Sequence, residues 1–467
     1  MLRRLLPMVI VGLLAAGIMA GYSIASADSH DPNGADTLAA DPNAAVNMAW
    51  TLMTAFLVFF MQAGFAFLGA GLIRAKNTTN YMAKSFMDFC IASLSYWAFG
   101  FAFMFGGSAL WAGLTDGNSV IGYSGFFLTS DAYDVKTIMA WLFQMVFAAT
   151  AATIVAGALA ERTNIHAYLA YSFIVGATIY PIYGHWVWGN GWMAPGFLNI
   201  GPNELAIGAR DFAGSGVVHV IGGGVALAGA FVVGPRIGKF SLDGTPNKLP
   251  GHNLVYVVIG TFILFFGWFG FNPGSTLAAT DLRIAVIATN TFLAGTTGAV
   301  VALYWSIVRT GKADIILACN GCLAGLVAIT AGCAFVEPWA AVVIGGVAGP
   351  VMIGGLNFVE RILKVDDAVG AVAVHFFGGL WGLLAVGIFA DGTYLGVSGL
   401  VEGSGWQLLA QLISMGVVAA WALVTGLVMF FLLKITMGVR VSREVELEGL
   451  DIPEHGIAAY GVGGGSD

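Results

Sequence analysis

Long apolar segments separated by short polar ones run along almost the whole chain. Most of these segments reach the roughly 20 residues that a helix needs to cross the hydrocarbon core of a bilayer. The pattern predicts an all-α integral membrane protein with about eleven spans. The expected bounds are 47–73, 83–107, 137–160, 165–189, 212–234, 253–272, 282–308, 313–335, 338–358, 368–390 and 405–437.

The composition agrees with a membrane protein and not with a large soluble one. Hydrophobic residues make up 58% of the 467 residues and charged residues only 10%, whereas soluble domains carry about 25% charged residues. The 66 glycines would weaken soluble helices, but they suit membrane helices whose backbones approach closely.

The first 27 residues form a separate segment. Arg3 and Arg4 precede a short apolar stretch, which ends at the small-residue sequence "ASA". This order is typical of a secretory signal peptide, predicted here as residues 1–27. An uncleaved first helix is the alternative. The polar residues 28–46 are expected to form a short extracytoplasmic lead.

The positions of Lys and Arg predict the orientation in the membrane. Of the 19 such residues, two lie in the expected signal peptide, fourteen follow odd-numbered spans and three follow even-numbered spans. Because cytoplasmic loops carry an excess of positive charge, the mature N-terminus is predicted outside and the C-terminus inside. An odd number of spans follows from this orientation.

One sequence pattern occurs twice, in "DFAGSGVVHVIGGG" (211–224) and in "DDAVGAVAVHFFGG" (366–379). Asp211 precedes His219 by eight residues, as Asp367 precedes His375, and each histidine is followed after two residues by Gly-Gly. The two copies fall five spans apart, so the two five-helix units insert with opposite orientation. This is the mark of an inverted repeat with its site near the midplane, and the eleventh span is left over.

Histidines inside membrane helices are costly and indicate a functional site, although a structural histidine bonded to a neighbouring helix is the alternative. No metal site is expected, because zinc needs three or four ligands and Cys319 and Cys322 read as small packing residues. An intramembrane hydrolase using Ser215 and His219 is a further alternative. A neutral imidazole pair can instead pass protons or hydrogen-bond a small neutral molecule, which suits a conduction path.

Aromatic residues gather at the predicted outer ends of two spans. "YGHWVWGNGW" ends the fourth span and includes Trp188, and "GWFGFNPGST" ends the sixth and includes Phe271 and Ser275. Aromatic faces attract cations, and a hydroxyl oxygen can accept a hydrogen bond from a cation that carries its own protons. An interfacial belt explains most of the tryptophans, but not the crowding of Phe, Asn, Pro, Gly and Ser at the sixth span.

Several stretches closely resemble the ammonium transporter (Amt/Rh) family, on its Amt branch. They are "FQMVFAAT" and "GALAER" (143–162), "HWVWG" (185–189), "DFAGSGVVH" (211–219), "WFGFNPGS" (268–275), "GLVAIT" (325–330), "VHFFGG" (374–379) and "EGLDIPEHGIAAY" (448–460). The resemblance implies an ammonium transporter and not an enzyme, without cofactor, metal or nucleic acid. It also implies an eleven-helix protomer, a homotrimer with one pore in each protomer, and a place in the cell (inner) membrane. An ammonium sensor on the same fold, with little conduction, is the alternative.

The resemblance also implies roles for individual residues. The outer ammonium-recruiting site would consist of Phe147, Trp188 and Ser275, supported by the buried acid Asp211. Phe147 and Phe271 would form the hydrophobic gate, and His219 and His375 the twin-histidine pair that lines the pore. Further positions beside the pore would be Phe143, Trp268 and Thr330.

Two positions depart from the family pattern. Many relatives have an acidic residue five positions before the second histidine, where this chain has Gly370; the second repeat is therefore expected to lack a carboxylate near the pore. Phe376 follows His375 and is expected to narrow or reshape the inner vestibule. The eleven-helix domain is expected at 47–437. The tail, 438–467, is expected to be cytoplasmic and regulatory, packed up to about Tyr460, with a PII-type signalling protein as a possible partner.

Overall fold

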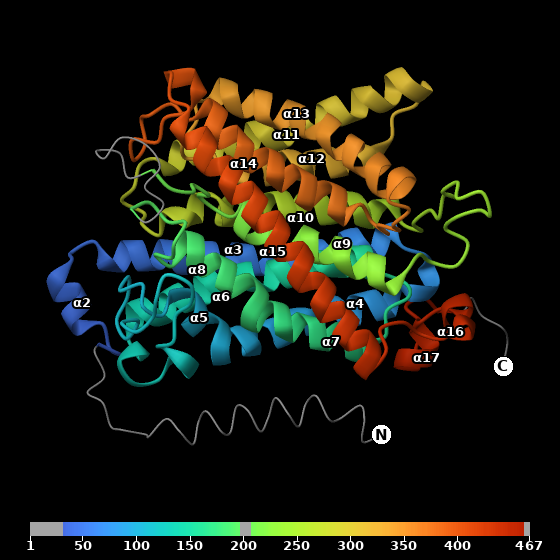
Figure 1. The fold of residues 1–467 in the computed structure, drawn as a ribbon, viewed down its shortest axis with the longest axis horizontal. Helices are drawn as coiled ribbons and strands as arrows, with labels where there is room; N and C mark the ends of the chain where they lie inside the picture. Colours follow the sequence, from blue (N-terminus) through green and yellow to red (C-terminus); the bar gives the residue numbers. More distant parts are fainter. Residues whose placement is uncertain (1–30, 197–206, 462–467) are drawn as a thin grey trace.

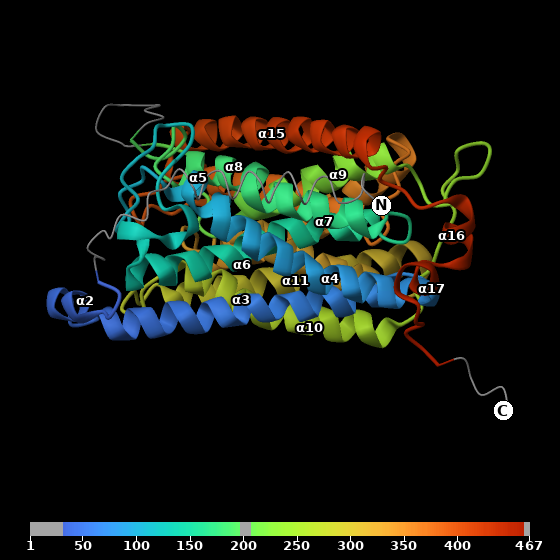
Figure 2. The ribbon, with the colours of Figure 1, turned by 90° about the horizontal axis from the view of Figure 1, so that it is seen from below.

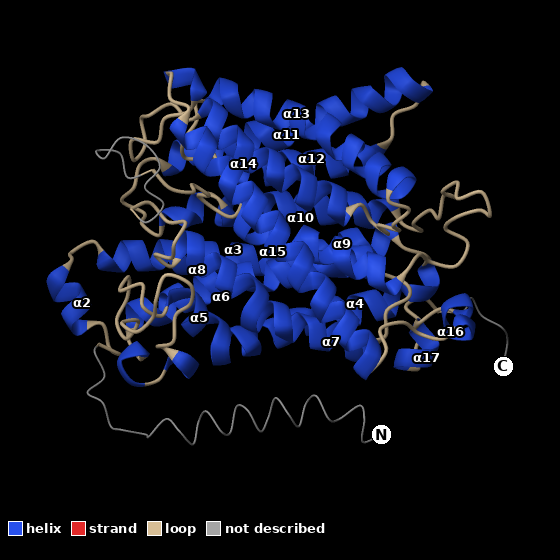
Figure 3. Ribbon diagram, viewed as in Figure 1, coloured by secondary structure: helices blue, strands red, loops and turns tan. Residues whose placement is uncertain are grey.

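The computed structural model describes residues 31–196 and 207–461. In these residues helices are the regular elements, and extended structure is limited to isolated bridges (Figure 3). The expected signal peptide, residues 1–27, and the last six residues of the tail lie outside the described residues.

Helices of very different length make up the described chain. Their bounds are α2 (Ala35–Ala40), α3 (Ala44–Leu72), α4 (Thr78–Ser95), α5 (Phe101–Phe105), α6 (Val135–Leu159), α7 (Ile165–Ile174), α8 (Tyr180–Trp188), α9 (Ile221–Val233), α10 (Leu254–Phe271), α11 (Ile284–Thr310), α12 (Ile315–Thr330), α13 (Pro338–Asn357), α14 (Gly378–Phe389), α15 (Trp406–Thr436), α16 (Arg443–Glu448) and α17 (Asp451–His455). Several continue directly into π-helical turns, and ten of the resulting runs within the described residues are long and apolar enough to cross a membrane.

Most of the long helices run close to the long axis of the molecule, and α15 crosses them obliquely (Figure 1). Figure 2 shows α2 at one end of the bundle, called here the lead end, and α16 and α17 at the other, called the tail end. α3 packs along α10, and α15 packs on α9 and α14. The bundle therefore brings the two sequence repeats together, with α9 and α14 near its middle.

The shorter helix α12 completes the bundle beside α11. It has 16 residues, or about 24 Å at 1.5 Å per residue, which is less than the usual span. At one end, Asp314 N donates to Ser306 Oγ near the end of α11 (3.0 Å). At the other end, Arg283 Nε donates to the carbonyl of Ala334 (2.9 Å). The segment after Thr330 thus extends α12 to the level at which α11 begins.

The second expected span, 83–107, begins too late. The helical run starts at Ala75 and continues to Phe105, so Lys84 lies well inside it and not near its start. Its ammonium group donates to Asn80 Oδ1 (2.7 Å) and to the carbonyl of Thr163, and it pairs with Glu454 at 3.4 Å. Hydropathy alone places the start of the span next to this lysine, whereas these partners let the helix begin well before it.

Candidate functional site

Both sequence repeats begin with a buried aspartate that caps a helix. Asp211 accepts hydrogen bonds from the backbone N–H groups of Gly214, Gly216 and Val217 at 3.0, 2.8 and 2.9 Å. Burial raises the pKa of the Asp211 carboxyl to about 6, although these three donors act to lower it. A carboxylate at this point supplies the acceptors that the first turn of a helix otherwise lacks.

Asp367 does the same in the second repeat. It accepts from the backbone N–H groups of Ala371, Val372 and Ala373 at 3.0, 2.8 and 3.3 Å, and burial raises its pKa to about 6 as well. The second repeat thus has its own buried capping carboxylate, although Asp367 is not among the residues that line the cavity beside His375. Gly370 has a φ of 84°, as Gly214 has a φ of 112°. The repeat thus places glycine where the chain is left-handed and the acid three residues earlier.

The two capped segments are π-helical and carry the histidines. His219 lies in η6 (Ser215–Val220) and His375 in η9 (Val372–Phe377). Their Nδ1 atoms are 3.1 Å apart and their rings are stacked, with centroids at 5.2 Å. In a neutral pair, one of these nitrogens donates the shared hydrogen and the other accepts it. Extra turns of π-helix occur frequently at functional sites.

Glycines let the two histidine segments approach. A Cβ on Gly223 would lie 2.4 Å from the backbone N of Phe376, and one on Gly379 would lie 2.5 Å from the carbonyl oxygen of Ser215. Any larger residue would separate the two backbones. The Gly-Gly pairs after each histidine are therefore a requirement of the contact between the repeats.

A column of aromatic rings leads from the histidines toward the lead end of the bundle. His219 stacks against both Trp268 and Phe271, each with centroids 5.4 Å away, and these two rings lie 5.6 Å from each other. Phe271 lies 4.1 Å from Phe147, and both rings are at most 1% exposed. Trp188 meets Phe147 edge-on at 6.3 Å. The predicted gate residues therefore contact each other directly and close the column.

Hydrogen bonds hold the column in place. Trp188 Nε1 donates to the carbonyl oxygen of Asp211 (2.7 Å), and Trp268 Nε1 donates to Thr330 Oγ1 (2.9 Å). The half-buried hydroxyl of Ser275 donates to the carbonyl oxygen of Phe271 (2.8 Å). Its hydrogen is thereby engaged, and the lone pairs of its oxygen are left to accept. Phe143 stacks behind Phe147 at 4.8 Å.

A small cavity of about 30 Å³ lies on the other side of the histidine pair. His375, Thr153, Tyr81 and Asn320 are among the residues that line it. Phe65, which the sequence analysis did not single out, lines it too and faces His375 at 6.3 Å. Only the histidine repeat could have pointed to this space, because its lining comes from helices far apart in the chain.

Two sequence expectations are not met by the geometry. Phe376 does not narrow this cavity, because its ring packs over Gly223 and Gly224 on α9. Ser215 Oγ donates to the carbonyl of Val327 and accepts from the N–H of Ala331, both at 2.7 Å. With Ser215 engaged there and His219 bonded to His375, the described residues contain no serine–histidine pair for a hydrolase.

A buried charge cluster at the tail end joins the ends of the two repeats. Arg236, just after α9, binds Asp366, just before η9, through two guanidinium nitrogens at 2.8 and 2.9 Å. Arg162 lies 3.9 Å from the same carboxylate. Burial alone would raise the pKa of Asp366, but the two arginines hold it well below its usual range. The charges compensate one another in a region that water does not reach.

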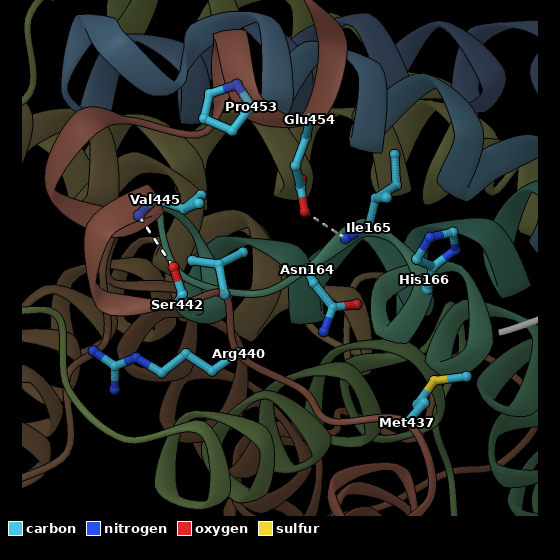
Figure 4. Close-up of a pocket in the computed structure, with 10 residues that line it drawn as sticks. Asn164, Ile165, His166, Met437, Arg440, Ser442, Val445, Pro453 and Glu454 are labelled. Carbon is cyan, nitrogen blue, oxygen red and sulfur yellow. Dashed lines mark hydrogen bonds between the residues drawn. The ribbon is translucent and has the colours of Figure 1, made fainter. Parts of the chain in front are cut away.

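The tail packs across this end of the bundle up to Tyr460, whose hydroxyl contacts His252 Nε2 at 2.6 Å. Asp451 accepts from the backbone N–H groups of Thr79 and Asn80 at the start of α4 (3.1 and 2.9 Å). Figure 4 shows a pocket of about 450 Å³ between the tail and the start of α7, where Glu454 accepts from the backbone N–H of Ile165 (3.1 Å). The tail from residue 438 to Tyr460 is thus an ordered part of the fold.

Comparison with known proteins agrees with this geometry. The model of the ammonium transporter family matches residues 49–460. Ammonium transporter Amt2 of Archaeoglobus fulgidus is 50% identical over 460 residues, covering 96% of each chain. Ammonium transporter 1 member 3 of Solanum lycopersicum is 41% identical, over 89% of this chain and 93% of the relative.

Two solved structures share the fold. A structure described as a sensor Amt protein superposes with a TM-score of 0.80 at 38% identity, covering 88% of this chain and 98% of that one. Mep2 of Candida albicans superposes with a TM-score of 0.75 at 29% identity, covering 86% and 87%. Together with the apolar helices, these matches establish a multi-pass membrane protein, and the chain belongs to the ammonium transporter family.

Proposed function

We propose that this protein carries ammonium across a cell membrane. The cation binds at the lead end, gives up a proton, and crosses as ammonia past the aromatic gate and the histidine pair. The observation that carries the proposal is the continuous column from Trp188 through Phe147 and Phe271 to His219 and His375. The transporters at 50% and 41% identity support the same conclusion.

The recruiting site combines two kinds of contact at the mouth. The faces of Trp188 and Phe147 attract a cation, each by about 0.5–2 kcal/mol depending on desolvation. The oxygen of Ser275, whose own hydrogen is engaged with Phe271, accepts a hydrogen bond from an N–H of ammonium. Potassium offers no hydrogen to this oxygen, so the pair of contacts discriminates between two ions of similar size.

The gate discriminates by charge. Phe147 and Phe271 are fully buried against each other, and moving a charge into such surroundings without compensating partners costs several kcal/mol. Ammonium escapes this cost by transferring a proton, whereas sodium and potassium cannot. Ammonia can then use the imidazole nitrogens of His219 and His375 as hydrogen-bond partners along the apolar path.

The membrane topology belongs to the proposal as well. The ten long runs together with α12 give eleven crossings, arranged as two five-helix inverted repeats and α15. We place the lead end outside after removal of a signal peptide, and the tail end, with its many Lys and Arg residues, in the cytoplasm. The assembly is a homotrimer in the cell (inner) membrane, and the domain bounds stay as predicted.

The tail is proposed to regulate transport from the cytoplasmic side. It contacts α4, α7 and the chain after α9 through Asp451, Glu454 and Glu446. A PII-type signalling protein is its proposed partner. Sensing without conduction is a less favoured function, because the relatives with the highest identities given above are named as transporters.

The test is a selectivity measurement on purified single variants in liposomes. His219→Ala and His375→Ala are expected to abolish ammonium transport, or its selectivity over potassium, while the protein still assembles. Purely structural histidines would tolerate His→Gln, because an amide can bond the same neighbours. Wild-type rate and selectivity in both Ala variants would overturn the proposal.

A further inference from the structure

A second polar cluster lies inside the membrane, apart from the aromatic column. Asp88 on α4 is completely buried, and it accepts hydrogen bonds from the hydroxyl of Thr153 on α6 (2.8 Å) and from the hydroxyl of Ser172 on α7. Thr153 also lies 2.9 Å from Oε1 of Gln62 on α3. Four helices thus contribute one polar side chain each to the same buried point.

This carboxyl group has no cation beside it within the described part of the chain. The ionisable groups that face it are the phenols of Tyr168 and Tyr171 from α7 and of Tyr81 from its own helix. Lys84, one turn away on α4, is turned to Asn80, Thr163 and Glu454 instead. An unpaired carboxylate in a membrane is costly, and such residues mark ion or proton paths.

The cluster borders the cavity below the histidines. Thr153 lines that cavity together with His375, while its hydroxyl contacts Asp88. Tyr81 lines the same cavity and also a second small one, which Lys84 and Tyr168 border nearer the tail end. A route of polar groups and small spaces therefore runs from His375 past Asp88 toward the cytoplasmic side.

We propose that Asp88 is a proton acceptor for the inner half of the path, a role that rests on the proposed transport of ammonium. An N–H bond of ammonium breaks at the mouth, and water molecules along the column relay the proton to an imidazole nitrogen of the histidine pair, where a new N–H bond forms. A water in the cavity takes this proton and passes one to Thr153 Oγ1, while the hydroxyl hydrogen of Thr153 moves to Asp88 Oδ2. Asp88 then releases its proton toward the cytoplasm. One ammonia and one proton arrive for each ammonium.

Two isosteric variants test the role. Asp88→Asn keeps the shape and hydrogen-bonding capacity of the side chain but cannot take up a proton. Thr153→Val removes only the bridging hydroxyl and leaves Asp88 intact. In proteoliposomes, both variants should reduce the ammonium-evoked current at least about tenfold, since positioned acid–base groups commonly contribute 10²–10⁴-fold. The pH dependence of the current should also differ from that of the wild type.

Thr150→Val is the matched control. Thr150 is buried one turn earlier on α6, and its hydroxyl donates only to the carbonyl of Val146 in its own helix, so the current should remain at the wild-type level. If Asp88 has only a structural role, the Asp88→Asn and Thr153→Val variants should show the current and the pH dependence of the wild type. That result would overturn the proposal. If Asp88→Asn does not assemble, Thr153→Val decides. A wild-type protein that takes up ammonia without any current would overturn the proton path alone, whereas one that takes up no ammonium at all would refute the transport function itself.

Discussion

Individual side chains at the mouth are fixed by one distant hydrogen bond and one local hydrogen bond. Trp188 is held by the carbonyl of Asp211, 23 residues later, and Ser275 by the carbonyl of Phe271. Each polar atom that these bonds use is removed from competition with the substrate. What remains exposed to the mouth is an aromatic face and a hydroxyl lone pair, which together suit a small cation with hydrogens.

Trp188→Leu should weaken ammonium binding without loss of assembly. The substitution removes the cation-attracting face, which is worth about 0.5–2 kcal/mol, so the half-saturation concentration should rise roughly 2- to 30-fold. Concentration dependence of transport in proteoliposomes measures it. Trp192→Leu is the control, because Trp192 packs on Trp186 and not on Phe147. Equal half-saturation in the wild type and Trp188→Leu would remove Trp188 from the site.

The capping role of Asp211 predicts a specific dependence of stability on pH. Because its pKa is raised to about 6, the folded protein binds this proton more tightly than the unfolded chain does. The stabilisation that the Asp211 carboxyl contributes is therefore fully present below about pH 4. It is lost as the pH rises through about 6, which lowers the free energy of unfolding by up to ~3 kcal/mol. Asp211→Asn should flatten this part of the curve, measured by thermal unfolding between pH 4 and 7.

Two further variants help to interpret the pH dependence of Asp211→Asn. Asp367, with the same raised pKa, remains in the variant, so part of the slope should persist and disappear only in the double Asn variant. Asp211→Ala, which removes the acceptors, should lower the folded yield and cost about 0.5–2 kcal/mol. An Asn variant that misfolds as the Ala variant does would show that capping is not what Asp211 provides.

At the scale of elements, the sequence predicted the repeat but not the backbone that it produces. The shared spacing of Asp211–His219 and Asp367–His375 was enough to place both histidines on related helices. The π-helical turns and the direct Nδ1 contact were not predictable, because they depend on how closely two distant segments pack. The repeat pairs Gly370 with Gly214 already in the sequence, but the left-handed conformation that both residues adopt is visible only in their positive φ angles.

Gly370→Ala should destabilise the second histidine segment. A side chain in the left-handed region costs roughly 1–2 kcal/mol, and the added Cβ would also lie 3.1 Å from Asn320 Nδ2. We expect a lower unfolding temperature for the purified protein in detergent. Gly354→Ala is the control, because Gly354 is helical in α13 and a Cβ there meets nothing within 4 Å. Equal melting temperatures of Gly370→Ala and the wild type would contradict the strain argument.

At the scale of the whole molecule, charged groups at the tail end link segments that are distant in the sequence. The apolar pattern predicts each of these segments independently and says nothing of such links. Hydropathy predicted most of the spans, and the family resemblance predicted an ordered tail. Neither could predict that the second helical run begins at Ala75, well before Lys84, because the partners of this lysine, Thr163 and Glu454, come from elsewhere in the chain. Polar contacts of this kind depend on the complete fold, whereas apolar spans are visible in each segment alone.

The tail should detach when its contact with α4 is removed. Asp451 is 3% exposed and supplies the acceptors for the first turn of α4, a role in which replacement by Ala costs about 0.5–2 kcal/mol. If cleavage requires the tail to open, Asp451→Ala should speed trypsin cleavage after Arg440 and Arg443 roughly 2- to 30-fold. Glu448→Ala, an exposed change in the same tail, should leave the rate unchanged. Equal rates in all three proteins would mean that the other contacts hold the tail without Asp451.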